Sequence, residues 1–142
     1  MEVLLDESTL GARLGGLAVS PDQQLLAYTH TSSVAADGAP VEYDVTVKNL
    51  DSGAVLSETL RAAHPKLVWG AGRDGGQVLY YIKPDASDGR AAELWRHVPG
   101  GADDLLLRED DVAFQLALSQ TTDERWLLAN IESSDTSEVH IL

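Results

Sequence analysis

The chain contains no cysteine, only one methionine and one phenylalanine, and only 10 lysine and arginine residues among its 142 residues. Without cysteine it has no disulfide, no thiolate metal ligand and no cysteine nucleophile. Its apolar runs all fall short of the roughly 18 residues that a membrane-spanning helix requires. The basic residues are scattered, whereas phosphate contacts need clustered lysine and arginine. We therefore expect a protein that binds neither membranes nor nucleic acid.

Acidic residues outnumber basic ones along the whole chain. The 23 aspartates and glutamates give a formal net charge of −13 at pH 7. The densest acidic stretches are residues 103–104 and 109–111, which we interpret as solvent-exposed loops, since charge blocks usually keep loops in solution. Residues 1–7 carry acids where a targeting presequence carries bases. We therefore expect a soluble, cytoplasmic protein.

Three similar units follow one another in the sequence. Each has a short apolar run, a turn with an aspartate and a second apolar run, and the turn residues Asp22, Asp74 and Asp123 lie 52 and 49 residues apart. Such a period is typical of β-propeller blades. The sequence predicts an all-β fold, a partial β-propeller of about three four-stranded antiparallel blades with about 11–12 strands. The ring should be open, because closed rings have roughly four to eight blades.

The units divide the chain, a single propeller-type region, into four segments. We assign residues 1–16 to an N-terminal strand and loop, 17–60 to blade 1, 61–111 to blade 2 and 112–142 to an incomplete blade 3 that lacks its last strand. Residues 8–16 are expected to form a loop or one helical turn. Residues 2–7 have the pattern of an outer strand, so one hypothesis pairs them with residues 138–142. The alternative leaves an open strand edge, which favours association.

Within blade 1 the strand signals are local. Residues 25–29 form a continuous apolar run, and residues 43–50 alternate, with Val45 and Val47 on one side. A turn at residues 51–53 predicts a return strand at 54–57. In each blade we expect the inner strands to be apolar and the outer strands to become more polar.

No catalytic motif is present. The G-x-S-x-G elbow of α/β-hydrolases is missing, and Ser20 lies in a Ser-Pro-Asp turn where its hydroxyl is expected to cap backbone groups. The glycine-rich residues 70–76 lack the G-K-[ST] ending of a phosphate loop and are interpreted as a strand-joining turn. We predict no catalytic, cofactor-binding or metal-binding residues and no cofactor.

The histidines and aromatic residues also lack a functional spacing. The histidines, which we expect at edges or in loops, are separated by 34, 33 and 43 residues, too far apart for a local metal motif. They are His30, His64, His97 and His140. The larger aromatic residues fall inside strand patterns and are interpreted as core or inter-blade packing. They are Trp69, Trp95, Trp126, Tyr80 and Tyr81.

Taken together, the units resemble the N-terminal propeller of oligopeptidase B, in the prolyl oligopeptidase family of serine peptidases. The matching segments occur in the same order and cover nearly the whole chain. They are residues 2–7, 17–22, 25–28, 45–53, 67–69, 79–81, 94–97, 109–111 and 136–142.

The resemblance implies a non-catalytic domain that filters short peptides into a cavity above an α/β-hydrolase domain. In the family that second domain carries the Ser, Asp and His and, in oligopeptidase B, cleaves after basic residues. This chain has none of those positions and about three of the seven blades. We therefore expect a truncated propeller segment that is inactive alone and whose partners are a hydrolase domain or peptides.

Two alternatives belong to other functional classes. The first is a free-standing β-repeat interaction module that associates with itself through open strand edges, since two copies supply about six blades. The second is an intact small enzyme with an unrecognised site.

Overall fold

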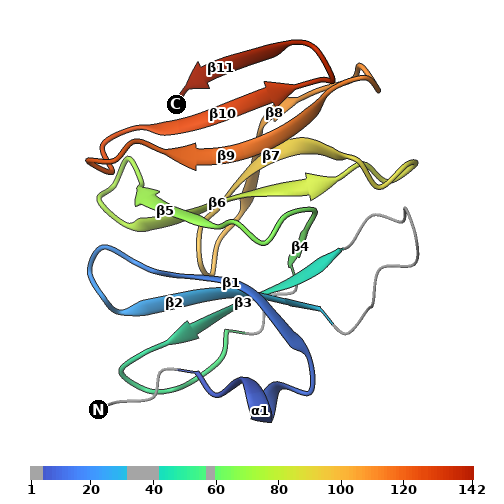
Figure 1. The fold of residues 1–142 in the computed structure, drawn as a ribbon. Helices are drawn as coiled ribbons and strands as arrows, with labels where there is room; N and C mark the ends of the chain where they lie inside the picture. Colours follow the sequence, from blue (N-terminus) through green and yellow to red (C-terminus); the bar gives the residue numbers. More distant parts are fainter. Residues whose placement is uncertain (1–4, 32–41, 57–59) are drawn as a thin grey trace.

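The computed structural model describes residues 5–31, 42–56 and 60–142, which form eleven strands and one helical turn. The strands make three antiparallel sheets that are stacked one above another (Figure 1). The first sheet contains β1 (Arg13–Val19), β2 (Leu25–Thr31), β3 (Tyr43–Asn49) and β4 (Leu60–Ala62). The second contains β5 (Val68–Ala71), β6 (Gln77–Pro84), β7 (Ala91–His97) and β8 (Asp103–Arg108). The third contains β9 (Gln115–Gln120), β10 (Leu127–Glu132) and β11 (Ser137–Ile141).

Each sheet is ordered as the chain runs, so that every strand pairs with the one that follows it. The orders are β1-β2-β3-β4, β5-β6-β7-β8 and β9-β10-β11. The connections after β1, β5 and β9 are tight turns that contain an aspartate. The expected all-β fold with three antiparallel sheets is confirmed, and the described residues do not close into a ring.

The sheets pack face to face through two apolar layers. Between the first and second sheets, Val45 and Val47 of β3 pack with Leu79 and Tyr81 of β6. Between the second and third sheets, other residues of β6 and β7 pack with β9 and β10, among them Ile82. Because side chains alternate along a strand, β6 contributes to both layers and is covered on both faces.

The second strand of a sheet is more buried than the first. Ala27 of β2 and Leu79 of β6 are fully buried, whereas β1 alternates between exposed and half-buried residues, with Leu17 56% exposed. β1 consists of small and apolar residues apart from Arg13, as expected of an inner strand, although it lies at the edge of its sheet and is partly exposed. The outer strand β8 is largely exposed, as expected.

The last strand of the first sheet differs from the prediction. Residues 54–57 were expected as the return strand, but only an isolated bridge joins Val55 to Lys48, and residue 57 lies outside the described residues. The regular strand is β4, which pairs with the other end of β3 through Leu60 and Val45. The reason is burial, because Val55 is 56% exposed whereas Leu60 is only 7% exposed.

The N-terminal segment forms a helical turn, α1 (Glu7–Leu10), capped by the side chain of Asp6. β1 then begins at Arg13, earlier than the run from Leu17 suggested. α1 lies below the first sheet, at the opposite end of the stack from β11 (Figure 1). The pairing of residues 2–7 with residues 138–142 is wrong for residues 5–7, since β11 pairs only with β10 in the described chain. Residues 2–4 lie outside the described ranges.

None of the helices in the described part of the chain is long and apolar enough to cross a membrane.

Candidate functional site

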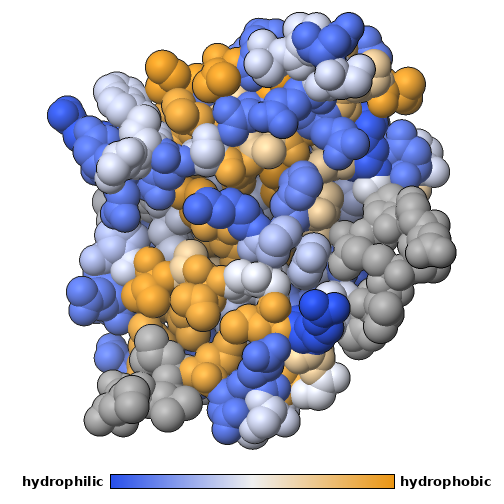
Figure 2. Space-filling model, in the orientation of Figure 1, coloured by the Kyte–Doolittle hydropathy of each residue, from blue (hydrophilic) through white to orange (hydrophobic). Residues whose placement is uncertain are grey.

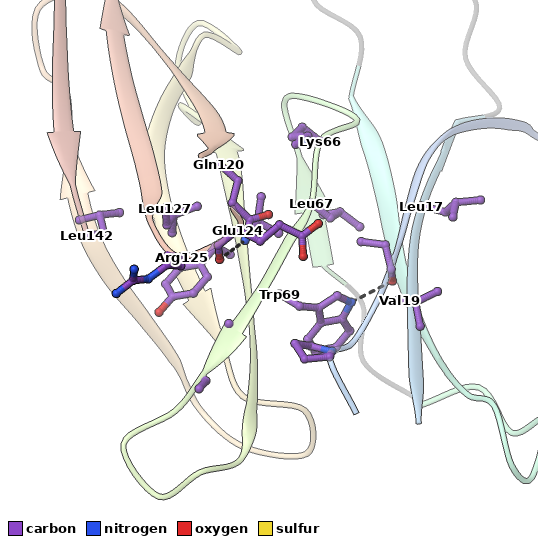
Figure 3. A pocket seen from close by; sticks show the side chains of 16 residues that line it. Leu17, Val19, Lys66, Leu67, Trp69, Gln120, Glu124, Arg125, Leu127 and Leu142 are labelled. Carbon is purple, nitrogen blue, oxygen red and sulfur yellow. Dashed lines mark hydrogen bonds between the residues drawn. The ribbon is translucent and has the colours of Figure 1, made fainter. Parts of the chain in front are cut away.

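A hollow lies where the first strands of the sheets approach one another. It has a volume of about 680 Å³ and is lined by the end of β1, by residues 66–71 around β5 and by the turn between β9 and β10. Figure 3 shows Val19, Trp69 and Leu127 among the side chains around it. We call this hollow the inner-strand groove. It brings together three segments that lie roughly 50 residues apart in the sequence.

A hydrogen bond across the sheets fixes one wall of the inner-strand groove. The indole Nε1 of Trp69 donates to the carbonyl oxygen of Ala18 over 2.8 Å (Figure 3). Trp69 is only 6% exposed, and its ring belongs to the apolar layer between the first and second sheets. A buried indole needs such an acceptor, because leaving its N–H unpaired is costly. The bond therefore holds β5 in place beside β1.

A close approach of backbone supports the same region. The hydroxyl of Thr29 accepts a hydrogen bond from the Gly16 amide and donates to the carbonyl oxygen of Pro65. A Cβ atom on Gly16 would lie 2.6 Å from that Pro65 oxygen. Glycine is required here because no side chain fits between β1 and the segment that leads into β5. Residues 63–67 are thus held directly against the first sheet.

The rim of the groove carries the aspartate turns that the repeat predicts. In the turn after β1, the Ser20 hydroxyl donates to the Asp22 carboxylate and accepts from the amide of Leu25 at 3.0 Å. The predicted capping role of Ser20 is therefore confirmed. The amide of Gln24 also donates to Asp22, at 3.0 Å. These donors, first of all the Ser20 hydroxyl, lower the pKa of Asp22.

The turn after β9 repeats this geometry with different residues. The Thr121 hydroxyl donates to Asp123 at 2.6 Å and accepts from the amide of Trp126 at 3.1 Å. The amide of Arg125 donates to Asp123 at 3.2 Å, and the pKa of Asp123 is lowered in the same way, mainly by the Thr121 hydroxyl. The two turns are therefore structural equivalents.

The turn after β5 is a variant of the same motif. The amide of Gly76 donates to Asp74 at 3.0 Å, but Gly72 stands at the position of Ser20 and Thr121 and has no hydroxyl. The third turn residue has a left-handed backbone in all three turns. The φ angles are 58° at Gln23, 82° at Gly75 and 59° at Glu124. Residues 70–76 thus join two strands, as expected, and form no phosphate loop.

The charges around the groove differ from those of the whole chain. Of the charged side chains that line it, Lys66 and Arg125 are basic and Glu124 is acidic. No carboxylate of the described residues forms an ion pair with Lys66 or Arg125. The lining therefore has a positive balance, although the chain as a whole carries −13.

The four histidines have separate surroundings. His30 contacts the hydroxyl of Thr46 at 3.1 Å, and His64 contacts the carbonyl oxygen of Leu116 at 3.0 Å. His140 lies 2.7 Å from Glu138 on β11. His97 is only 2% exposed and is bonded to Asp103, so its expected place at an exposed edge is wrong. Within the described ranges no three His, Asp or Glu side chains are grouped as metal ligands.

The aromatic residues mostly pack as expected. Trp69 and Tyr81 are buried in the layer between the first two sheets, and Trp95 packs against that layer. Tyr80 packs against the layer between the second and third sheets. Trp126 is the exception, since it is 50% exposed at the turn after β9.

Sequence reasoning did not find the inner-strand groove. The signal in the sequence is slight, because Lys66 and Arg125 are isolated basic residues beside apolar runs. Their common location depends on how the sheets stack, which no local pattern encodes.

Comparison with known proteins gives a consistent result over the whole chain. A family model described as the prolyl oligopeptidase N-terminal beta-propeller domain matches residues 1–142. Dipeptidyl aminopeptidase BI of Pseudoxanthomonas mexicana is 32% identical over 146 residues, which cover 97% of this chain and 19% of that protein. Protease 2 of Moraxella lacunata is 24% identical over 99% of this chain and 21% of its own length. The chain thus spans about a fifth of the length of these relatives.

Solved structures have the same fold. Oligopeptidase B from Leishmania major matches with a TM-score of 0.85 and 22% identity, over 99% of this chain and 20% of that one. Oligopeptidase B from Trypanosoma brucei, in a closed form with covalently bound antipain, matches with a TM-score of 0.78 and 26% identity, over 99% of this chain and 19% of that one. The stacked sheets are therefore part of a β-propeller, as the repeat predicts.

Proposed function

Because the chain belongs to the prolyl oligopeptidase family, as part of its N-terminal β-propeller domain, we propose that it is a non-catalytic propeller segment that controls the access of peptides to an α/β-hydrolase domain. The reaction it serves is the hydrolysis of short peptides after basic residues, which the resemblance to oligopeptidase B implies. The catalytic serine, aspartate and histidine belong to that partner domain.

One observation carries this proposal. The family match extends over residues 1–142, and those residues fold into three stacked sheets whose first strands line one groove. Each sheet is then one blade, with blades divided close to residues 61 and 112. In a propeller the first strands of the blades surround the central channel. A chain with this geometry supplies part of a channel wall rather than a reaction centre.

A chimeric enzyme tests the proposal. Residues 1–142 replace the matching fifth of dipeptidyl aminopeptidase BI, and hydrolysis is compared for a short arginine-containing peptide and for an unfolded protein chain that contains the same site. The expected chimera cleaves the short peptide and discriminates against the long chain. The control lacks residues 1–142 and should lose that discrimination. A chimera that cleaves both substrates as the deletion control does contradicts the proposed gating role.

The exposed face of the third sheet favours a second candidate, an interaction module that associates with itself. Val139 is 55% exposed, Ile141 is 68% exposed and Leu142 is 46% exposed. Figure 2 shows hydrophobic residues around β11 at the upper left and over the first sheet at the lower left, with hydrophilic residues between them. Exposed apolar patches often mark interaction surfaces.

Sedimentation equilibrium distinguishes the two candidates. The self-association candidate predicts a dimer that Ile141→Lys converts to a monomer, whereas a channel-wall segment without that role is a monomer in both forms. Ile141→Lys is suited to this test because the Ile141 side chain is exposed, so the substitution would place a charge within the proposed contact.

A further inference from the structure

Two cations that pair with no described carboxylate line the inner-strand groove, although the chain has an excess of acids. Five other basic side chains form ion pairs, among them Arg61 with Asp44 at 3.1 Å. The others are Lys83, Arg90, Arg96 and Arg108. Lys66 and Arg125 form none with any residue that the structure describes. Two cations left unpaired at one groove favour an anionic ligand.

Apolar side chains also line the groove, beside these cations and the carboxylate of Glu124. Val19 is 39% exposed and Leu142 is 46% exposed, and both line the groove with Leu127. Arg125 lies two residues before Leu127, whose carbonyl oxygen accepts a hydrogen bond from the amide of Leu142 over 3.0 Å. Arg125 is therefore close, along the chain and through this bond, to two of the apolar residues that line the groove. The ligand that fits such a surface has an apolar side chain and a carboxylate close together.

We propose that the inner-strand groove binds the C-terminal end of a short peptide. The terminal carboxylate is bound by the guanidinium of Arg125, which matches a carboxylate with two parallel hydrogen bonds. Lys66 adds longer-range attraction, and the last apolar side chain of the peptide packs on Leu127 and Leu142. The inference rests on the proposed function, since peptides reach this groove if the chain serves a peptidase.

The size of the groove agrees with this ligand. Its volume of about 680 Å³ lies within the range of roughly 300–1,000 Å³ that is usual for pockets that hold small ligands. A few residues of extended peptide fit such a space, whereas a folded protein does not. Capture of a terminal carboxylate is a known way in which proteins recognise peptide ends. A groove with this specificity would favour short peptide substrates, because in a short peptide the C-terminus lies close to every peptide bond that could be cleaved.

Fluorescence anisotropy with the whole 142-residue chain tests the inference. The probes are an N-terminally labelled pentapeptide that ends in leucine and phenylalanine with a free carboxylate, and the same peptide with a C-terminal amide. We expect the acid to bind about twofold to fivefold more tightly than the amide, as one exposed charge pair allows. Equal binding of the two probes, or binding of neither, overturns the inference.

Variants assign the effect to Arg125. Arg125→Gln should abolish the preference for the acid, whereas Arg125→Lys should retain part of it. Lys66→Gln should reduce the preference for the acid less than Arg125→Gln does. The matched control is Arg73→Gln, since Arg73 is also exposed and forms no ion pair with a described residue, but does not line the groove. A loss of preference in Arg73→Gln equal to that in Arg125→Gln would mean that bulk charge is responsible, and would overturn the inference. Circular dichroism verifies that each variant is folded.

The binding measurements and the chimeric enzyme test different proposals. A chimera without size discrimination, together with an intact preference for the acid, contradicts the proposed function alone. A discriminating chimera without that preference contradicts only the carboxylate site.

Discussion

The indole of Trp69 donates a 2.8 Å hydrogen bond to the carbonyl oxygen of Ala18, which joins the first strand of the second sheet to the first strand of the first sheet. Trp69→Phe retains an aromatic ring but removes this bond, so we expect the free energy of unfolding to fall by about 1–3 kcal/mol. Urea unfolding followed by circular dichroism measures the change. Trp126→Phe is the control and should change it by less than about 0.5 kcal/mol, since Trp126 is 50% exposed.

Gly16 lies against the backbone of the segment that connects the first two sheets. A Cβ atom at this position would be 2.6 Å from the carbonyl oxygen of Pro65. This oxygen belongs to the backbone, so it cannot move away as the end of a flexible side chain can. Gly16→Ala should therefore destabilise the protein by about 1–3 kcal/mol. The same urea titration measures the change in the free energy of unfolding. A decrease of less than about 0.5 kcal/mol would contradict the close packing of Pro65 on β1.

The left-handed turn position provides a reciprocal pair of substitutions. Gln23 has a φ of 58°, and Gly75 has a φ of 82° at the equivalent place with no atom near its missing Cβ. Gln23→Gly relieves the strain of a side chain in this region and should raise the free energy of unfolding by about 0.5 kcal/mol. Gly75→Ala introduces that strain and should lower it by about 1 kcal/mol. Effects of the same sign would argue against a shared turn geometry.

Adjacent aspartates on β8 should differ in their importance for stability. Asp103 accepts hydrogen bonds from Tyr81 and His97 and lies 3.7 Å from the ammonium of Lys83. Burial, with the nearby Asp103, raises the pKa of Tyr81, so the phenol stays protonated and donates at neutral pH. Asp103→Asn should cost about 1–3 kcal/mol. Asp104→Asn is the control, because the Asp104 side chain is 51% exposed and, within the part of the chain that the structure describes, pairs only with Arg96.

The loss of stability at acidic pH should depend in part on the turn aspartates Asp22 and Asp123. The pKa of Asp22 and that of Asp123 are lowered below 3.8 by hydroxyl and amide donors that exist only in the folded turns. Each of these carboxylates therefore contributes fully to the free energy of unfolding at pH values above its pKa in the unfolded chain. The contribution is lost as the pH falls through its pKa in the folded chain. Carboxyl NMR titration should give values below 3.8 for both. Ser20→Ala should raise the pKa of Asp22 and leave that of Asp123 unchanged.

The strands and turns that depend on local sequence were predicted well. The apolar runs at β2 and β6, the alternation of Val45 and Val47 in β3 and the spacing of the turn aspartates each indicate one element, and each appears in the structure. These features need only side-chain alternation and turn chemistry, which neighbouring residues determine.

Features that depend on contacts between residues far apart in the sequence were not predicted. His97 of β7 is buried beside Asp103 of β8, which accepts its hydrogen bond, whereas residues 103–104 were expected in a solvent-exposed loop. β4 was placed too early because the turn at residues 51–53 suggested an immediate return strand, whereas burial selects Leu60. The inner-strand groove joins Lys66 to Arg125 only through the stacking of the sheets.

We propose that this chain is a non-catalytic part of a propeller. The most direct measurement incubates the purified chain with a serine-reactive fluorophosphonate and, separately, with an arginyl ester substrate. We expect neither covalent labelling nor turnover. Stoichiometric labelling accompanied by hydrolysis, both abolished by substitution of a single serine, would contradict it.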